Sequence, residues 1–258
     1  MTVAPKHSFA LATADRRLRT IQMISGPVGT GKTRYGLTAP DPLFALSFDK
    51  GLEGVVEEFV EAGKRIQVAD YDWHPGTEDF SQAYAQQLRD QVIRDYEYAL
   101  ANARSILVDK ETDLWELFRY AEFGRPNESP KDYVKLNQRY KAFINAAKKT
   151  DVNLVLIDSM KDDWGTVGAI NSTTGKRSLT KIGTQSRRGF DALDELVYVE
   201  TEFAREPSTD PEAPGAVFYI DVKKCRQNSA LQEQRFESMT FSEFGTLLIP
   251  GSSIEDWS

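Results

Sequence analysis

Short apolar runs alternate with longer amphipathic stretches along most of the chain. The apolar runs occupy residues 21–25, 43–48, 66–69, 105–109 and 152–157. They lack the alternation of polar and apolar residues seen in half-exposed strands, which is typical of strands buried on both faces of a parallel sheet. Between them, residues 52–63, 78–103, 114–123 and 133–149 carry apolar side chains at helical spacing. The pattern predicts an α/β fold in which helices cover both faces of a mostly parallel sheet.

The longest predicted helix, at residues 78–103, has a regular apolar stripe. A large apolar residue recurs at every fourth position, at Phe80, Tyr84, Leu88, Val92, Tyr96 and Leu100. The pattern favours a core-facing surface over a platform on which nucleic-acid bases stack.

The pattern changes in the last quarter of the chain. Residues 196–203, 216–224 and 245–249 are predicted as strands, and the proline-rich segment 207–214 is predicted as a turn or insertion. We therefore expect antiparallel strands toward the C-terminus. Because no linker is long enough to separate two domains, we expect an N-terminal lead-in (1–20), a single domain (21–250) and a C-terminal tail (251–258).

Composition narrows the class of protein. The 258 residues carry a formal net charge of −7, so the protein as a whole is not a basic nucleic-acid binder, although a local basic patch is compatible with that charge. The single cysteine, Cys225, excludes an internal disulfide and a multi-cysteine zinc site, and it fits a reducing cytoplasm. No apolar run approaches the length of a transmembrane helix, and no secretory signal is evident. We expect a cytoplasmic protein that does not bind membranes.

The first apolar run leads directly into a glycine-rich motif. Gly26-Pro-Val-Gly-Thr-Gly-Lys-Thr33 fits the pattern G-x-x-x-x-G-K-[ST] of phosphate-binding loops. Its glycines allow successive N–H groups to point inward at phosphate oxygens, and the following helix presents its positive end to the same anion. Lys32 is expected to reach the β- and γ-phosphates of ATP, and the Thr33 hydroxyl to ligate Mg²⁺. The predicted nucleotide-binding residues are Gly26, Pro27, Val28, Gly29, Thr30, Gly31, Lys32 and Thr33.

A carboxylate at the end of a buried strand is expected to complete the metal site. Asp109 is favoured, because it ends an apolar run that should lie beside the loop. Asp158 has the same form, and Asp49, at the end of another run, is a candidate ligand for a metal-bound water. Hydrolysis also requires a residue that orients the attacking water, and spacing alone leaves Glu53 and Glu111 as equal candidates.

Two basic segments stand out in this acidic chain. Residues 165–189 contain no Asp or Glu, which favours a flexible positive loop that contacts DNA phosphates, with a solvated loop as the alternative. The cations of this segment are Lys176, Arg177, Lys181, Arg187 and Arg188. At the end of a predicted strand, Lys224 and Arg226 are candidates for contacting a γ-phosphate, in their own subunit or in a neighbouring one. The alternative there is an edge strand protected by lysines.

With these motifs in this order, the chain resembles the RecA-type recombinase ATPases. It is most similar to small phage ATP-binding proteins described as "AAA domain" proteins, which work beside single-strand annealing proteins. The resemblance covers about residues 20–249 and depends on residues 26–33, 106–115, 133–149, 187–191 and 222–228.

The resemblance implies a RecA-like core that assembles on single-stranded DNA as a homo-oligomer, with ATP between subunits. It implies that Asp109 is the Walker B acid, that residues 165–189 face DNA, and that Lys224 and Arg226 touch the neighbouring subunit's nucleotide. The chain departs from the family at Asp49-Lys-Gly51, where RecA-type proteins usually have Asp-x-Glu, and at Asp158, where related phage proteins often have His.

The leading hypothesis is a phage-type, Mg²⁺-dependent ATPase that binds single-stranded DNA and assists recombination or annealing. A single-strand annealing or single-strand-binding protein is the expected partner. The missing Asp-x-Glu favours, as an alternative, a nucleotide-gated assembly or loader protein with weak hydrolysis and a protein partner. A small-molecule kinase is disfavoured, because no Arg-rich lid follows the P-loop.

Overall fold

Strands and helices alternate along the computed structural model of the chain, which describes residues 17–74, 81–124, 133–167, 178–208 and 215–258. The main sheet contains β1 (Ile21–Ser25), β2 (Leu43–Ser47), β3 (Ile66–Asp70), β4 (Ser105–Asp109), β5 (Asn153–Ile157), β8 (Val199–Pro207), β9 (Ala216–Cys225) and β10 (Arg235–Glu237). A separate hairpin contains β6 (Met160–Val167) and β7 (Ser178–Arg187). The helices are α1 (Lys32–Leu37), α2 (Val56–Glu61), α3 (Gln82–Asn102), α4 (Glu111–Phe123), α5 (Tyr133–Ala146), α6 (Leu193–Leu196) and α7 (Phe241–Leu248), with 3₁₀ turns η1 (Ala147–Lys149), η2 (Ser229–Leu231) and η3 (Glu255–Trp257).

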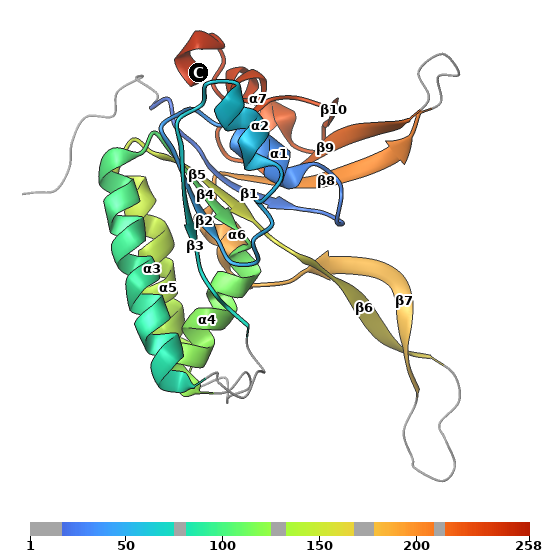
Figure 1. Cartoon of the computed structure of the whole chain (residues 1–258). Helices are drawn as coiled ribbons and strands as arrows, with labels where there is room; N and C mark the ends of the chain where they lie inside the picture. The colour runs from blue at the N-terminus through green and yellow to red at the C-terminus, as the bar shows by residue number, and fades with distance from the viewer. Residues whose placement is uncertain (1–16, 75–80, 125–132, 168–177, 209–214) are drawn as a thin grey trace, which may run out of the picture.

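The main sheet has eight strands in the order β10-β9-β8-β1-β5-β4-β2-β3 (Figure 1). The strands from β8 to β3 in this order are parallel to one another, whereas β9 and β10 run antiparallel to their neighbours at one edge. The predicted α/β fold, with a mostly parallel sheet and antiparallel strands toward the C-terminus, is therefore confirmed.

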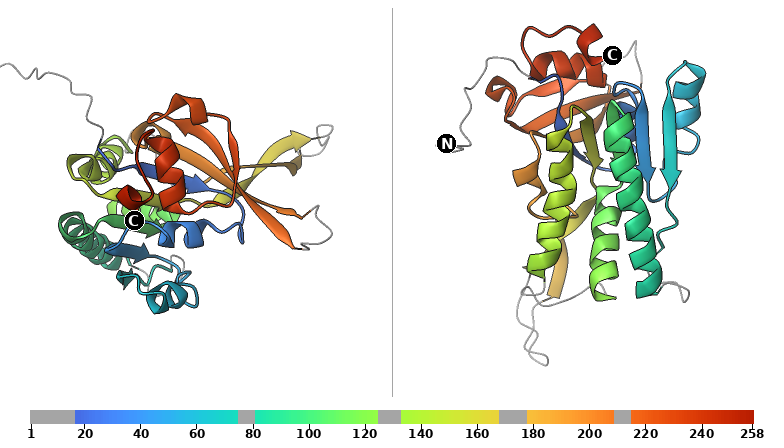
Figure 2. Two further views of the ribbon diagram at one scale, coloured as in Figure 1. Left: turned by 90° about the horizontal axis from the view of Figure 1, so that it is seen from above. Right: turned by 90° about the vertical axis from the view of Figure 1, so that its left-hand side faces the viewer.

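Helices cover both faces of the sheet, as the uninterrupted apolar runs predict. Helices α3, α4 and α5 lie side by side over one face (Figure 2), where they pack on Ile106 and Val108 of β4. Helices α1 and α7 cover the other face and pack on Leu107, the residue between those two. Successive side chains of a strand point to opposite faces, so a strand buried on both sides needs apolar residues throughout.

The register of the parallel strands brings the polar strand ends together. Ile157 of β5 pairs with Ile24 of β1 on one side and with Asp109 of β4 on the other. Asp109 in turn pairs with Ser47 of β2. The P-loop, Asp109, Asp158 and the segment after β2 therefore leave the sheet at the same carboxyl edge, where parallel α/β sheets bind their ligands.

Helix α3 buries only the middle of its predicted stripe. Leu88, Val92 and Tyr96 are buried, but Tyr84 is 36% exposed. Each step of four residues advances about 40° around an α-helix, so a stripe with that spacing turns away from the core at its ends. Ala85 and Ala99 are buried there instead. Phe80 lies outside the described residues.

The segment after β5 differs from the predicted flexible loop. Strands β6 and β7 pair antiparallel from Met160–Arg187 to Val167–Ser178 and form a two-stranded hairpin that extends away from the main sheet (Figure 1). Side chains are described only for its root, at residues 160–163 and 184–187. Most of the described residues between 165 and 189, predicted as a basic loop, therefore belong to the strands of this hairpin.

Two predictions about the C-terminus are corrected. Residues 245–249, predicted as a strand, lie in α7 and its end, because a capping box at Thr240 and Glu243 starts a helix there. Residues 251–258, predicted as a tail, fold back onto the domain. Trp257 is fully buried against the ring of Phe241, at a centroid distance of 6.1 Å.

Candidate functional site

A cavity of about 610 Å³ opens at the carboxyl edge of the main sheet. It is lined by residues 26–34 of the glycine-rich loop, and by Asp49, Asp109 and Asp158 from the ends of neighbouring strands. Loop and acids come from distant parts of the sequence and meet because their strands are parallel and in register. We call this space the nucleotide cavity.

The backbone of the loop requires glycine at defined positions. Gly26 has φ +137°, and a Cβ atom there would lie 2.3 Å from the carbonyl oxygen of Phe203 in β8. Gly31 has φ +88° and is the N-cap of α1, so the N–H groups of the first helical turn face the cavity without a capping side chain. Both positions exclude residues with a side chain, and the second leaves backbone donors for an anion.

Lys32 and Thr33 project from the first turn of α1 into this cavity. The Lys32 Nζ donates to the carbonyl oxygens of Gly26 and Pro27, each at 2.7 Å. Burial lowers the pKa of Lys32, and the charge of Asp109 partly opposes that shift. The Thr33 hydroxyl donates to Oδ2 of Asp109 at 3.1 Å. The cavity therefore contains a cation, Lys32, next to the hydrogen-bonded pair of the Thr33 hydroxyl and the Asp109 carboxylate.

Asp109 and Asp49 form an acidic wall with a lysine between them. Burial, with a smaller contribution from the charge of Asp49, raises the pKa of Asp109 to about 6. The Nζ of Lys110 lies 2.5 Å from Oδ2 of Asp49. Burial tends to lower the pKa of Lys110, but the hydrogen bond to Asp49 and the charges of Asp49, Asp113 and Asp109 together outweigh it, and the net shift is upward. Asp49 is therefore held in the cavity by a cation.

The structure does not bring the two predicted water-orienting residues to the cavity. Glu53 is exposed in the turn before α2 and does not line it. Glu111, the first residue of α4, is completely buried, and its Oε1 accepts a hydrogen bond from the Tyr140 hydroxyl at 2.6 Å. The two-residue alternation expected from Asp109 to Glu111 ends because β4 stops at Asp109 and a helix begins two residues later.

Asp158 lines the cavity but is engaged in a separate buried network. Its Oδ1 accepts the Thr112 hydroxyl at 2.5 Å, and its Oδ2 lies 2.7 Å from the Arg187 guanidinium. Burial raises the pKa of Asp158, while the ion pair with Arg187 opposes that shift. The pKa of Glu111 is raised well above its usual range by burial and by the nearby Asp158. Of the two candidate metal acids, Asp109 is therefore the one in contact with Thr33.

The structure places the predicted DNA-contacting cations in different environments. The guanidinium of Arg187 is largely buried and ion-paired with Asp158. It also donates to the carbonyl oxygens of Phe190 and Asp191, so its role is to stabilise the turn after β7. Arg188 is half exposed and pairs with Glu116. Lys181 lies on β7, where its side chain is not described, and Lys176 and Arg177 lie outside the described residues.

Lys224 and Arg226 lie at the edge of the sheet opposite the nucleotide cavity. Cys225 pairs with Val199, which pairs with Gln22 near the start of β1. The Nζ of Lys224 donates to the carbonyl oxygen of Asp194. Neither residue lines the cavity of its own chain, so a contact with the chain's own γ-phosphate is wrong, and only a contact with a neighbour's nucleotide stays open.

Three residues near the loop were missed from sequence. Gln185 of β7 and Phe218 of β9 line the nucleotide cavity. The exposed guanidinium of Arg205 on β8 lies over the Phe218 ring at 5.7 Å, beside Gly29. No motif marks these residues, because strand pairing alone brings them to the loop.

The comparisons with known proteins agree with this geometry. A family model described as "AAA domain" matches residues 19–228 of the chain. The match begins just before β1 and ends after β9, so it spans the loop, the acids and the hairpin. The comparison of the chain with curated proteins found no match. In the part of the chain that the structure describes, no helix is long and apolar enough to cross a membrane.

Proposed function

Because the chain belongs to the AAA-domain family of P-loop ATPases, we propose that it is a Mg²⁺-dependent ATPase that binds single-stranded DNA in phage recombination or annealing. The observation that carries the ATPase activity is the contact between Thr33 and Asp109 inside the glycine-rich loop's cavity. A hydroxyl and a carboxylate at hydrogen-bond distance, beside phosphate-binding N–H groups, are the protein ligands expected for a phosphate-bound cation.

The residues present fit Mg²⁺. This cation is usually held by one or two carboxylates, a hydroxyl and substrate phosphates, and it does not need an all-protein cage. Among the described residues, no group of three His, Cys, Asp or Glu side chains is arranged to hold a metal by itself. When bound, Mg²⁺ would neutralise charge on the β- and γ-phosphates. Thr33 and Asp109 would hold it.

The chain's own residues account for phosphate binding. The N–H groups of the loop and of the first turn of α1 donate to phosphate oxygens. Lys32 exchanges its carbonyl partners in the loop for the β- and γ-phosphates, which are stronger acceptors because they are charged. This exchange requires only rotation of a flexible side chain.

We assign orientation of the attacking water to Asp49. It is the acid that lines the cavity without a bond to Thr33 or Arg187, which hold Asp109 and Asp158 respectively. It follows strand β2, which neighbours the strand of Asp109. Lys110 holds its carboxylate in place, with 2.5 Å between Nζ of Lys110 and Oδ2 of Asp49. Asp49 thus occupies the region of the site where RecA-type relatives have Asp-x-Glu.

The DNA-binding role is supported by the hairpin. It extends from the main sheet next to the nucleotide cavity, and Gln185 of its β7 strand lines that cavity. Its sequence between residues 165 and 187 carries cations and no acid. A projecting positive hairpin is suited to a phosphate backbone, and its contact with the cavity would couple DNA to the nucleotide.

A nucleotide-gated loader protein with a protein partner is the second candidate. It is favoured by the ion pair between Lys110 and Asp49, because a carboxylate oxygen that contacts a lysine is not available to an attacking water. It predicts slow hydrolysis and partner binding that depends on ATP.

The test is ATP turnover with and without single-stranded DNA, together with mass measured by light scattering. The proposal predicts Mg²⁺-dependent turnover that rises with single-stranded DNA, and an ATP-dependent increase in mass, as expected for a homo-oligomer. Turnover that does not respond to single-stranded DNA, together with no measurable affinity for DNA, would refute the DNA-binding role. ATP-dependent capture of an annealing or single-strand-binding protein without DNA stimulation would favour the loader.

A further inference from the structure

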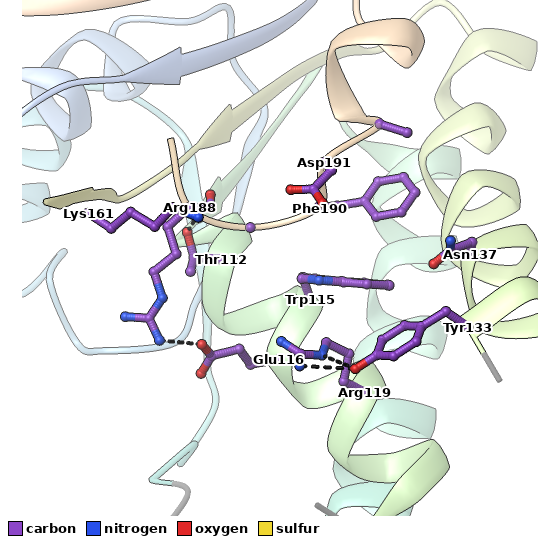
Figure 3. A pocket seen from close by; sticks show the side chains of 12 residues that line it. Thr112, Trp115, Glu116, Arg119, Tyr133, Asn137, Lys161, Arg188, Phe190 and Asp191 are labelled. Atoms are coloured by element: carbon purple, nitrogen blue, oxygen red, sulfur yellow. Dashed lines mark hydrogen bonds and ion pairs between the residues drawn. The ribbon is translucent and has the colours of Figure 1, made fainter. Parts of the chain in front are cut away.

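A second cavity, of about 690 Å³, lies between α4, α5 and the turn that follows β7 (Figure 3). It shares no lining residue with the nucleotide cavity. We call it the hairpin pocket, because Lys161 at the root of the β6–β7 hairpin and Arg188, directly after β7, form one side of it. Its volume is within the range of ligand sites.

Flat aromatic side chains form much of the wall. Trp115 of α4 lies 4.8 Å from Phe190 and 6.5 Å from Tyr133 of α5, measured between ring centroids. The guanidinium of Arg119 lies 5.6 Å from the centre of the Tyr133 ring and donates to its hydroxyl at 3.1 Å. Figure 3 shows these side chains around one space, contributed by two helices and a turn. Tyr133 and Arg119 are partly exposed and offer planar surface to a flat ligand, whereas Trp115 and Phe190 are 6% and 3% exposed and are packed into the core.

The polar groups of the hairpin pocket suit a ligand with an anionic group. Arg119, Arg188 and Lys161 outnumber the acids Glu116 and Asp191 in a chain whose net charge is −7. Arg188 pairs with Glu116, and about half of the surface of its side chain remains exposed.

Asn137 adds unused hydrogen-bonding capacity to the wall. Its amide faces Trp115 and Phe190 in Figure 3. Its Oδ1 is buried and has no hydrogen-bond partner among the described residues. Because a buried amide without a partner is costly, a ligand that supplies one gains affinity.

The turn that closes the pocket is held rigidly from behind. Arg187 donates to the carbonyl oxygens of Phe190 and Asp191 at 2.9 and 3.2 Å. Gly189 packs so closely on the buried acids that a Cβ atom would lie 2.6 Å from Oε2 of Glu111 and 2.8 Å from Oδ1 of Asp158. A pre-formed wall lowers the cost of ordering a bound ligand.

We propose that the hairpin pocket binds one nucleotide unit of single-stranded DNA, with the base against the Tyr133 ring, beside Trp115, and the phosphate at Arg188 and Lys161. The inference rests on the proposed DNA function and adds a specific site to it. Aromatic faces combined with cations are how proteins bind unpaired strands. Bases in a duplex are stacked and paired, so the pocket would select single strands.

The experiment follows tryptophan fluorescence as single-stranded oligonucleotides are added, with Mg²⁺ and a non-hydrolysable ATP analogue present. A base held against Tyr133, whose ring centroid lies 6.5 Å from that of Trp115, should quench the signal. The quenching should disappear in W115F and persist in W73F. In parallel, fluorescence anisotropy of a labelled oligonucleotide should show about fivefold weaker binding for R188A, with a salt dependence reduced by about one counterion.

Arg139→Ala is the matched control for R188A, because Arg139 is an exposed arginine paired with a glutamate, Glu122, and lies outside the hairpin pocket. Full quenching in W115F would refute DNA binding at the hairpin pocket, and so would equal DNA affinities of R188A and R139A. Either result would leave the proposed DNA function of the chain intact. No DNA binding by the unaltered chain would remove both. If free dAMP quenched the fluorescence with the same affinity as the oligonucleotide, the hairpin pocket would be a site for free nucleotides and not for DNA. R188A alters an exposed side chain, so it decides the question even if W115F fails to fold.

Discussion

Asp109 and Glu111 are separated by one residue in the sequence, yet they belong to two different regions of the molecule. Asp109 lines the nucleotide cavity and accepts a hydrogen bond from Thr33. Glu111 is completely buried beneath the turn that follows β7, and it accepts a hydrogen bond from the Tyr140 hydroxyl. One acid faces a site that suits a cation, and the other supports the scaffold beside it.

The difference shows how the carboxyl edge of this sheet is divided. Asp158 lies between the two regions, because it lines the nucleotide cavity and also forms an ion pair with Arg187 at the end of β7. Acids with an opening to the cavity can exchange partners with a ligand. Acids closed in by helices α4 and α5 are limited to internal partners, so their charge must be neutralised within the fold.

The largest expected effect separates the two closed acids. Asp158→Asn should lower the free energy of unfolding by about 4 kcal/mol, because it leaves the Arg187 guanidinium without its anion. Glu111→Gln should change it by less than about 1 kcal/mol. Burial and the charge of Asp158 raise the pKa of Glu111, which favours its neutral form, and an amide replaces a neutral carboxyl group well. Urea unfolding of both variants measures the difference, and equal losses would show that Glu111 carries the charge.

Lys32→Ala should weaken ATP binding about 300-fold, which corresponds to roughly 3.4 kcal/mol from lost charge-assisted hydrogen bonds to phosphate. Isothermal titration calorimetry gives the affinity. Lys141→Ala removes an exposed lysine paired with Glu195, outside the nucleotide cavity, and is the matched control. Unchanged ATP affinity in Lys32→Ala would refute the assignment of the loop.

Asp49→Asn should lower kcat for ATP about 100-fold with little change in ADP affinity, because it removes the group proposed to orient water. Glu53→Gln, the exposed counterpart from the same segment, should retain full turnover. Steady-state turnover combined with ADP titration tests the pair. Loss of turnover in Glu53→Gln, with Asp49→Asn active, would reverse the assignment.

The smallest expected effect concerns the pH dependence of stability in EDTA. The pKa of Asp109 is raised to about 6, so between its unfolded value near 4 and pH 6 the folded chain binds more protons than the unfolded chain. Stability should therefore fall as pH rises through this window, by at most about 2 kcal/mol. Asp109→Asn removes the titrating group, so the variant should gain stability relative to the unaltered chain from pH 4 to 7. Chemical denaturation across that range checks the sign, and a constant difference would contradict the shift.

The sequence already contained most of the nucleotide cavity. The loop is contiguous, and its glycines and Lys32 act through local backbone geometry, so a short motif identifies them. Asp109 was identifiable because an acid that ends an apolar run lies at the carboxyl edge of a parallel sheet. The parallel strands were predicted from their uninterrupted apolar runs and the longer helices from the helical spacing of their apolar residues, whereas β6, β7 and β10 were not predicted.

Other features depended on contacts between distant segments. Glu111 was misplaced because the change from strand to helix after Asp109 reverses the direction of its side chain. Residues 245–249 are apolar enough for a strand, but the cap at Thr240 and the burial of Trp257 against α7 make them helical.

The sequence by itself therefore determined the fold class, the phosphate-binding loop and the acid that meets it, since each depends on local pattern or on strand direction. Only the tertiary structure decided that Asp49 shares the cavity and that Glu111 does not. It alone showed that Lys224 and Arg226 lie at the opposite edge, and that a second, aromatic cavity lies at the root of the hairpin. These facts follow from strand register and from the packing of α4 and α5, and both are settled by burial of surfaces from residues far apart in the chain.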